Sequence, residues 1–259
     1  MNIIEGVATP AMSTGQVVNA YVQEARAEVL RYLRLPGFLL PTMLFPSVFY
    51  LMFGIFLARQ NSPDAARYLL ASYGTFGVMA PGLFGFGVSL AIDREHGLLT
   101  LKRALPMPPG AYLVGKMCMA LIMASVVTTI MLCLAIFGAH VQLGAGNIAQ
   151  FFVTEVLGVL AFCSLGLLLG TLAKGQSAPG MVNLIYLPMA FLSGLWFPLS
   201  IMPKFLQAIA PVWPAYHLDQ LALSAIGMGQ GGELGHVAVL VGFTAVFLYV
   251  AGRRLARHG

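Results

Sequence analysis

Six long apolar segments dominate the sequence, and most polar residues lie in the short stretches between them. A helix needs about 20 mainly apolar residues to cross the hydrocarbon core of a bilayer, and each segment approaches or exceeds this length. We therefore predict an all-α integral membrane protein with six transmembrane helices. The predicted spans are residues 37–57, 68–91, 113–137, 151–173, 179–197 and 236–252.

Two segments outside these spans have patterns of their own. Residues 13–34 repeat apolar positions at steps of three or four, which predicts an amphipathic helix lying on the membrane surface. A helix that packs on a partner protein is the alternative. Residues 198–223 are semi-apolar and too interrupted for a plain span, which favours one or two short re-entrant helices. The interrupting prolines are Pro198, Pro203, Pro211 and Pro214.

The chain thus divides into an N-terminal tail with its amphipathic helix, residues 1–34, and a six-span domain, residues 35–259. Composition supports this division, because 59% of the residues are hydrophobic and only 9% are charged. Soluble domains carry about 25% charged residues. The formal net charge of +5 comes from basic residues beside the apolar runs. Such residues indicate topology and do not indicate nucleic-acid binding.

The distribution of Lys and Arg predicts the orientation, since basic residues accumulate on the cytoplasmic side. Six spans with a cytoplasmic N-terminus place eleven basic residues inside and three outside. The inside set is Arg26, Arg31, Arg34, Arg94, Lys102, Arg103, Lys116, Lys174, Arg253, Arg254 and Arg257, and the outside set is Arg59, Arg67 and Lys204. We expect a multi-pass protein of the cytoplasmic (inner) membrane, in contact with membrane lipid, with both termini inside.

The loop between the second and third spans is densely charged. Leu98, Leu101 and Leu105 fall on one predicted helical face beside two basic residues, and Pro106 ends any helix. A short amphipathic helix of this kind can dock on another protein. A charged loop that only fixes topology is the alternative, and the pattern alone favours neither.

The order of residues in this loop resembles the signature of the type-2 ABC transporter permeases. An acidic residue is followed by Arg and Glu, Gly, a Leu/Thr-rich turn, a basic pair, a proline turn and Gly-Lys at 115–116. A second stretch, from Phe191-Leu192-Ser193-Gly194 to Pro198 and the later prolines, is similar to the end of a span and the re-entrant helices of that family. This sequence departs from the family at 219–221, where an arginine often stands.

The resemblance implies the membrane subunit of an ATP-driven exporter of an amphiphilic or hydrophobic substrate such as a drug, antibiotic or lipid. It implies a homodimer, or a pair with a similar chain, with ATP and Mg bound by a separate nucleotide-binding ATPase subunit and no cofactor or enzyme site in this chain. An ATP-independent transporter or channel is the alternative. The charged loop would be the coupling helix that contacts the ATPase. Its residues are Asp93, Arg94, Glu95, Gly97, Leu98, Leu101, Lys102, Arg103 and Leu105.

Residues 110–116 fit the start of a phosphate-binding loop, but Met117 stands where Ser or Thr would bind magnesium. The segment also runs into a predicted span, so we predict no nucleotide site here. The five histidines show no metal-ligand spacing, and we predict no metal site.

Several residues in the spans could contact a substrate. Glu155 is acidic within the fourth span, where charge is costly and often functional. It could bind a cationic substrate or a proton, or else reach the membrane interface or accept a backbone hydrogen bond. The residues predicted along a substrate path are Phe49, Phe53, Phe84, Glu155 and Trp196.

Overall fold

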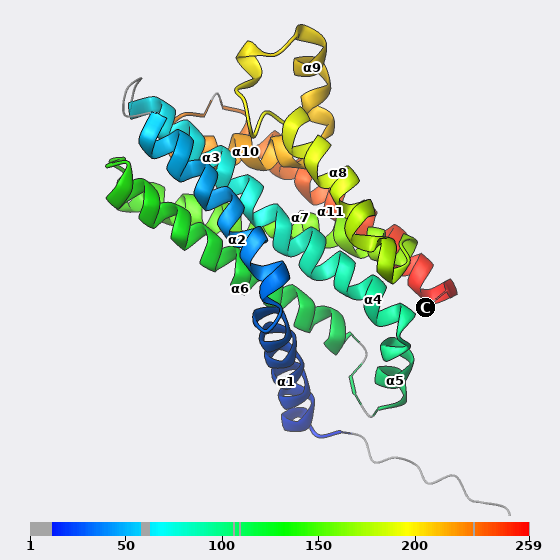
Figure 1. Ribbon diagram of the computed structural model, residues 1–259. Helices are drawn as coiled ribbons and strands as arrows, with labels where there is room; N and C mark the ends of the chain where they lie inside the picture. The colour runs from blue at the N-terminus through cyan, green and yellow to red at the C-terminus, as the bar shows by residue number, and fades with distance from the viewer. Residues whose placement is uncertain (1–11, 58–62, 106, 109, 230, 259) are drawn as a thin grey trace, which may run out of the picture.

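The chain folds into a bundle of inclined long helices with shorter helices at its two ends (Figure 1). The computed structural model describes residues 12–57, 63–105, 107–108, 110–229 and 231–258, and these residues contain helices and no strand. The all-α prediction is therefore confirmed for this part of the chain. The predictions for residues 1–11 and Arg59 lie outside it.

Several of the bundle helices change from α to π geometry without a break. The bundle helices are α2 (Pro36–Phe49) with η1 (Tyr50–Leu57), α3 (Pro63–Ala80) with η3 (Pro81–Val88) and α4 (Ser89–Glu95), α6 (Ala111–Cys133) with η4 (Leu134–Gly138), α7 (Ala145–Leu172), α8 (Ala178–Leu192) and α11 (Glu233–His258).

Four described helices are long and apolar enough to cross a membrane: Asp64–Glu95, Ala111–Gly138, Ala145–Leu172 and Glu233–Leu255. They coincide with the second, third, fourth and sixth predicted spans. The first and fifth predicted spans correspond to shorter helices, since the apolar part of the first runs over Thr42–Leu57 and α8 has 15 residues. The count of six spans therefore stays a prediction.

The helix Asp64–Glu95 is the centre of the bundle. In its most apolar stretch 89% of the residues are buried, whereas the corresponding share in α11 is 11%. Its η3 segment lies directly on α7. A Cβ added to Gly87 would stand 2.7 Å from the carbonyl oxygen of Gly166, so only glycine permits this approach. Small residues let membrane helices pack closely where no hydrophobic driving force joins them.

We name each end of the bundle after a short helix that lies there. The α5 end carries α5 (Leu98–Ala104), the turn η5 (Gly175–Ser177) and α1 (Thr14–Leu33), and the α9 end carries η6 (Leu199–Ile201), α9 (Lys204–Ile209) and η7 (Ala210–Val212) (Figure 1). The α10 helix (Pro214–Ala225) packs against α3, α7 and α11. Residues 198–223 therefore hold four short helical segments, where one or two were predicted, and their re-entrant placement stays a prediction. The prolines border them, since Pro198 precedes η6, Pro203 precedes α9, Pro211 lies in η7 and Pro214 begins α10.

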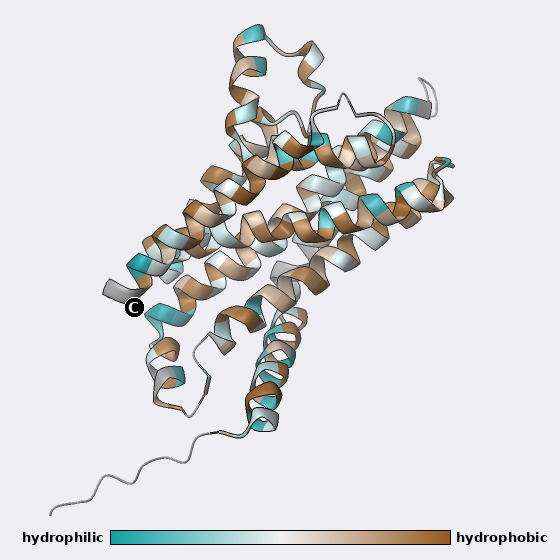
Figure 2. Ribbon diagram, turned by 180° about the vertical axis from the view of Figure 1, so that it is seen from behind, coloured by the Kyte–Doolittle hydropathy of each residue, from teal (hydrophilic) through white to brown (hydrophobic). Residues whose placement is uncertain are grey.

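The helix predicted over residues 13–34 is α1, and Ser13 and Gln16 form a capping box at its start. Its two glutamates face the protein, because Glu24 and Glu28 are buried while Val18 and Val22 are more than half exposed. This is the reverse of a surface helix in a soluble protein. Figure 2 shows the alternation of hydrophilic and hydrophobic residues along this helix beside the mostly apolar bundle.

Candidate coupling site

A network of charged side chains joins α1, α4, α5 and α6 at the α5 end. We call it the charge network. It contains the acids Glu24, Glu28 and Asp93, all buried, and the bases Arg31, Lys102 and Lys116. The charges balance three against three, which offsets the cost of removing them from water.

Lys116 is the centre of the charge network and is fully buried. Its Nζ donates to Glu28 Oε2 at 2.9 Å and to Ser89 Oγ at 2.7 Å, and it lies 3.3 Å from Asp93 Oδ2. Ser89 in turn donates to the carbonyl oxygen of Gly85. A buried ammonium is stable only with such partners, so Lys116 joins α6 to both α1 and α4.

Asp93 receives three further donors. Arg31 approaches it with both terminal nitrogens, Nη2 to Oδ1 at 2.6 Å and Nη1 to Oδ2 at 3.0 Å. The hydroxyl of Tyr112 donates to Oδ2 at 2.7 Å. The hydrogen bonds that Arg31 donates to Asp93 raise the pKa of Arg31, and bidentate pairs of this kind fix geometry as well as charge. Arg31 therefore holds the end of α1 against α4.

Lys102 brings α5 into the charge network. Its ammonium pairs with Glu24 and lies 3.9 Å from Glu28 Oε1. The ammonium groups of Lys102 and Lys116 lie 4.7 and 4.8 Å from the centroid of the Tyr112 ring, where the electron-rich face attracts cations. The short α5 is thus anchored on α1 and α6.

The remaining polar residues of the predicted coupling set hold the loop in place. Arg94 donates to the carbonyl oxygen of Gly170 at 2.9 Å, at the end of α7. Glu95 is exposed and lies over Gly175 in the turn before α8. Gly97 has φ +70°, a left-handed conformation that suits glycine and lets the chain turn from α4 into α5.

The predicted leucine face is wrong in one respect. The helix ends at Ala104, and Leu105 adopts an extended conformation beyond it, so the three leucines do not share one helical face. Leu98 is half-buried, whereas Leu101 and Leu105 are 59% and 48% exposed. The result is an exposed apolar tip, made of Leu101 and Leu105. The side chain of Arg103 lies outside the described part of the chain.

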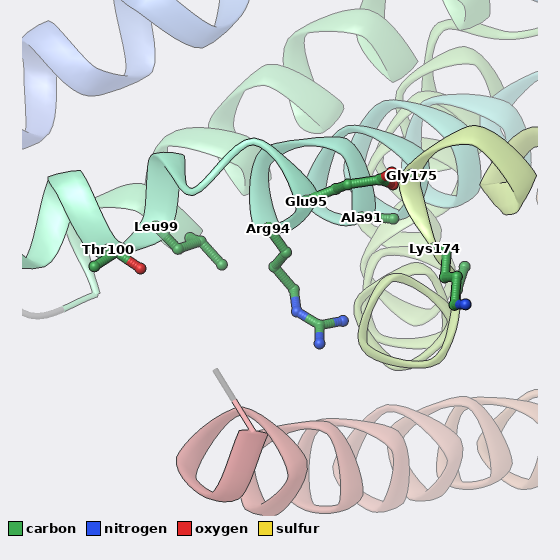
Figure 3. Close-up of a pocket in the computed structure, with 8 residues that line it drawn as sticks. Ala91, Arg94, Glu95, Leu99, Thr100, Lys174 and Gly175 are labelled. Carbon is green, nitrogen blue, oxygen red and sulfur yellow. The ribbon is translucent and has the colours of Figure 1, made fainter.

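A groove lies beside this tip, between α4, α5 and the turn that joins α7 to α8 (Figure 3). Its volume is about 420 Å³, and both a glutamate and two basic side chains line it. The lining residues are Ala91, Arg94, Glu95, Leu99, Thr100, Ala173, Lys174 and Gly175. Two loops distant in sequence therefore form one polar surface at the α5 end.

Sequence reasoning missed four members of the charge network, Glu24, Glu28, Arg31 and Lys116, and also Tyr112, which donates to Asp93. One signal was available for α1, because Glu24, Glu28 and Arg31 recur at steps of four and three and so share one face. A second signal was Lys116, a lysine followed by a long apolar run, which needs a counter-charge when it is buried.

The predicted substrate-path residues divide into two groups. Phe49, Phe53 and Trp196 line an apolar pocket of about 360 Å³ together with Tyr68 and Tyr73. Phe84 instead packs edge-on against Tyr186, with 5.3 Å between the ring centroids. We call the pocket that Phe49, Phe53 and Trp196 line the aromatic pocket.

Glu155 belongs to neither group. It is fully buried, and its Oε1 accepts a hydrogen bond of 3.0 Å from the hydroxyl of Thr75. This bond comes from a side chain and not from the backbone, and the interpretation that Glu155 reaches the membrane interface stays a prediction.

Comparison with known proteins gives matches over most of the chain. The family model described as ABC-2 type transporter matches residues 21–226. The chain is 27% identical to the putative transport permease YvfS of Bacillus subtilis (strain 168) over 242 residues, which are 90% of this chain and 96% of that protein. It is 28% identical to the inner membrane transport permease YhhJ and 30% identical to the probable multidrug ABC transporter permease YbhR, both of Escherichia coli (strain K12). These two matches cover 57% and 59% of this chain, respectively. They cover only 40% of the length of each relative.

Proposed function

The chain belongs to the ABC-2 type transporter family, and from this premise we propose how it works as the membrane subunit of an ABC exporter. Members of this family are permease subunits that act with an ABC ATPase subunit. In this proposal the partner subunit binds ATP and Mg, and the present chain moves an amphiphilic or hydrophobic substrate outward. The family match sets aside the ATP-independent transporter considered from the sequence.

The exposed apolar tip of α5 carries the proposal. Leu101 and Leu105 are exposed beside a helix whose Lys102 is anchored by Glu24. An apolar tip on a fixed helix suits docking into a groove of another protein, because the burial of the leucines stabilises the contact and the anchor preserves its geometry. We infer that α5 is the coupling helix, and that the groove around Lys174 and Gly175 forms the rest of the docking surface.

The charge network supplies a path from this contact to the bundle. A displacement of α5 acts on α1 through Lys102 and Glu24, and on α4 and α6 through Lys116 and Asp93. The α4 helix continues without a break into η3 and α3, the most buried helix of the bundle. Closure of the ATPase would thus move the central helix as a unit, instead of deforming a flexible loop.

Two further elements belong to the proposal. We propose a homodimer, because two nucleotide-binding subunits need two coupling helices and the described residues of this chain contain one. We also propose that the aromatic pocket takes part in the substrate path. Phe49, Phe53 and Trp196 give it an apolar lining that suits a hydrophobic or amphiphilic molecule.

The topology in this proposal has six spans, with the α5 end in the cytoplasm. The first span is α2 with η1, which together cover Pro36–Leu57, about 33 Å of helix at 1.5 Å per residue. The apolar outer face of α1, with Val18 and Val22, would lie in the membrane interface.

A labelling experiment tests this topology. In a variant without Cys118, Cys133 and Cys163, single cysteines are introduced as Thr100→Cys in α5 and Ser200→Cys in η6, both at exposed positions. A membrane-impermeant maleimide added to intact cells should label S200C and leave T100C unlabelled until the cells are opened. The reverse pattern would show that the α5 end faces outward, where no ATPase subunit could reach it.

Co-purification tests the function itself. The tagged chain, extracted from its native membrane, should bring with it a protein that binds ATP. The complex in proteoliposomes should hydrolyse ATP, be inhibited by vanadate, and move a lipophilic probe only when ATP is present. If transport proceeds without ATP and no nucleotide-binding protein is retained, the exporter assignment is wrong.

A further inference from the structure

Two acidic side chains are buried where α3, α7 and α10 meet, and neither belongs to the charge network. Glu155 on α7 is fully buried, and Asp219 on α10 is 1% exposed. Glu155 lies ten residues after the start of α7, about 15 Å along the helix. No ion pair among the described residues includes either acid.

Hydroxyl groups of α3 face both acids. Ser72 and Thr75 are three residues apart and so lie on one side of the helix. Thr75 donates to Glu155 Oε1, and Ser72 faces the carboxyl group of Asp219. Leu218, the neighbour of Asp219 in the chain, lies against Gly158 of α7, about one turn from Glu155. The four side chains therefore form one cluster across three helices.

Three oxygen atoms of this cluster are buried and have no hydrogen-bond partner among the described residues: Glu155 Oε2, Asp219 Oδ1 and Ser72 Oγ. Buried polar atoms are nearly always satisfied, and a buried carboxylate is costly unless a positive charge accompanies it. The fully buried Ser72 hydroxyl is an independent sign that the cluster is built to hold something.

The neighbouring polar groups of the described residues bond to other partners, except for the buried Nε of Arg67, which has none among them. On α3, Arg67 donates through Nη2 to the carbonyl oxygen of Ile226, and the hydroxyl of Tyr68 donates to that of Gly194. On α10, His217 is bonded to Pro211 and to His236 of α11. On α7 the charged group at this place is Glu155, which is one of the two acids. None of these groups forms an ion pair with either acid, so a cation from outside the protein would supply the compensating positive charge.

We propose that Glu155, Asp219, Ser72 and Thr75 form a binding site for a small monovalent cation, either a proton or an alkali-metal ion. Carboxylate and hydroxyl oxygens are the ligands that hard cations prefer. An occupied site would hold α7 and α10 against α3, whereas two bare carboxylates would push these helices apart.

Unfolding of the purified chain in detergent tests this site and needs no nucleotide-binding subunit, so its result is independent of the proposed exporter function. The unfolding midpoint is measured in choline, sodium and potassium chloride of equal ionic strength, at a mildly acidic and a mildly alkaline pH. A ligand that binds only the folded protein raises the midpoint. If the ligand is an alkali-metal ion, the unfolding midpoint should be higher in the chloride of that ion than in choline chloride. A proton should give a midpoint that is highest at acidic pH, falls as pH rises and does not depend on the salt.

Substitutions assign the effect to the cluster. Glu155→Gln and Asp219→Asn remove the charge and keep the shape, so they should abolish the response. Ser72→Ala keeps both acids and should raise the cation concentration at half-effect about tenfold, since one oxygen atom that contacts the charged ligand is lost. Asp64→Asn, at an exposed position of α3, should respond like the wild type. If wild type, S72A and both charge variants respond alike to salt and pH, the site does not exist.

Discussion

Replacement of Lys116 by methionine should reduce the free energy of unfolding by about 3–5 kcal/mol, the usual cost of removing one partner from a buried ion pair. The lysine is fully buried, and its ammonium meets Glu28, Asp93 and Ser89. Methionine fills a similar volume without the charge, so two buried carboxylates lose a cation that water cannot replace. Denaturant unfolding of the chain in detergent measures the loss.

Two further variants separate this effect from a general one. Lys204→Met removes an exposed lysine at the α9 end, and its free energy of unfolding should stay within about 0.5 kcal/mol of the wild type. Adding Glu28→Gln to K116M removes one of the orphaned charges and should recover part of the stability, which gives the coupling energy of the pair. A K116M protein as stable as wild type would show that the network contributes no stability.

The long helices could be predicted from the sequence because burial in a bilayer imposes a single requirement, an apolar run of sufficient length. The third span, predicted over residues 113–137, is observed over Ala111–Gly138. The fifth was predicted too long, to residue 197, whereas α8 ends at Leu192. Gly194 there has φ +86°, which turns the chain out of the helix. Hydropathy does not register such a turn, because the residues after it are still apolar. The π-helical segments likewise leave no trace in an apolar run.

The candidate site could be predicted only in part. The charged loop was recognisable, since its residues are contiguous. The charge network was not, because its pairs join residues far apart in the sequence: 62 positions separate Arg31 from Asp93, 78 separate Glu24 from Lys102, and 88 separate Glu28 from Lys116. A single sequence carries no signal for such pairing. For the same reason, the pattern could not show that Phe49 and Trp196 meet in one pocket while Phe84 packs elsewhere.

Replacement of Leu101 by aspartate should uncouple the transporter while leaving the chain folded. Leu101 is 59% exposed, so the substitution buries no charge within the chain and should not change its unfolding midpoint. In a complex with the ATPase subunit, the same side chain would enter an apolar groove. Loss of such a central contact costs about 2 kcal/mol or more, so the affinity between the two subunits should fall by about 30-fold or more. ATP-dependent transport in proteoliposomes should fall with it.

Leu234→Asp is the matched control, because Leu234 is 87% exposed in α11 at the opposite end of the bundle. It introduces the same charge and should leave the affinity for the ATPase subunit unchanged. L101D and K116M should then differ in kind, since L101D removes a contact with the partner and K116M removes the support behind it. If L101D binds the ATPase and transports as well as L234D does, α5 is not the docking helix, and the groove beside Lys174 becomes the surface to test.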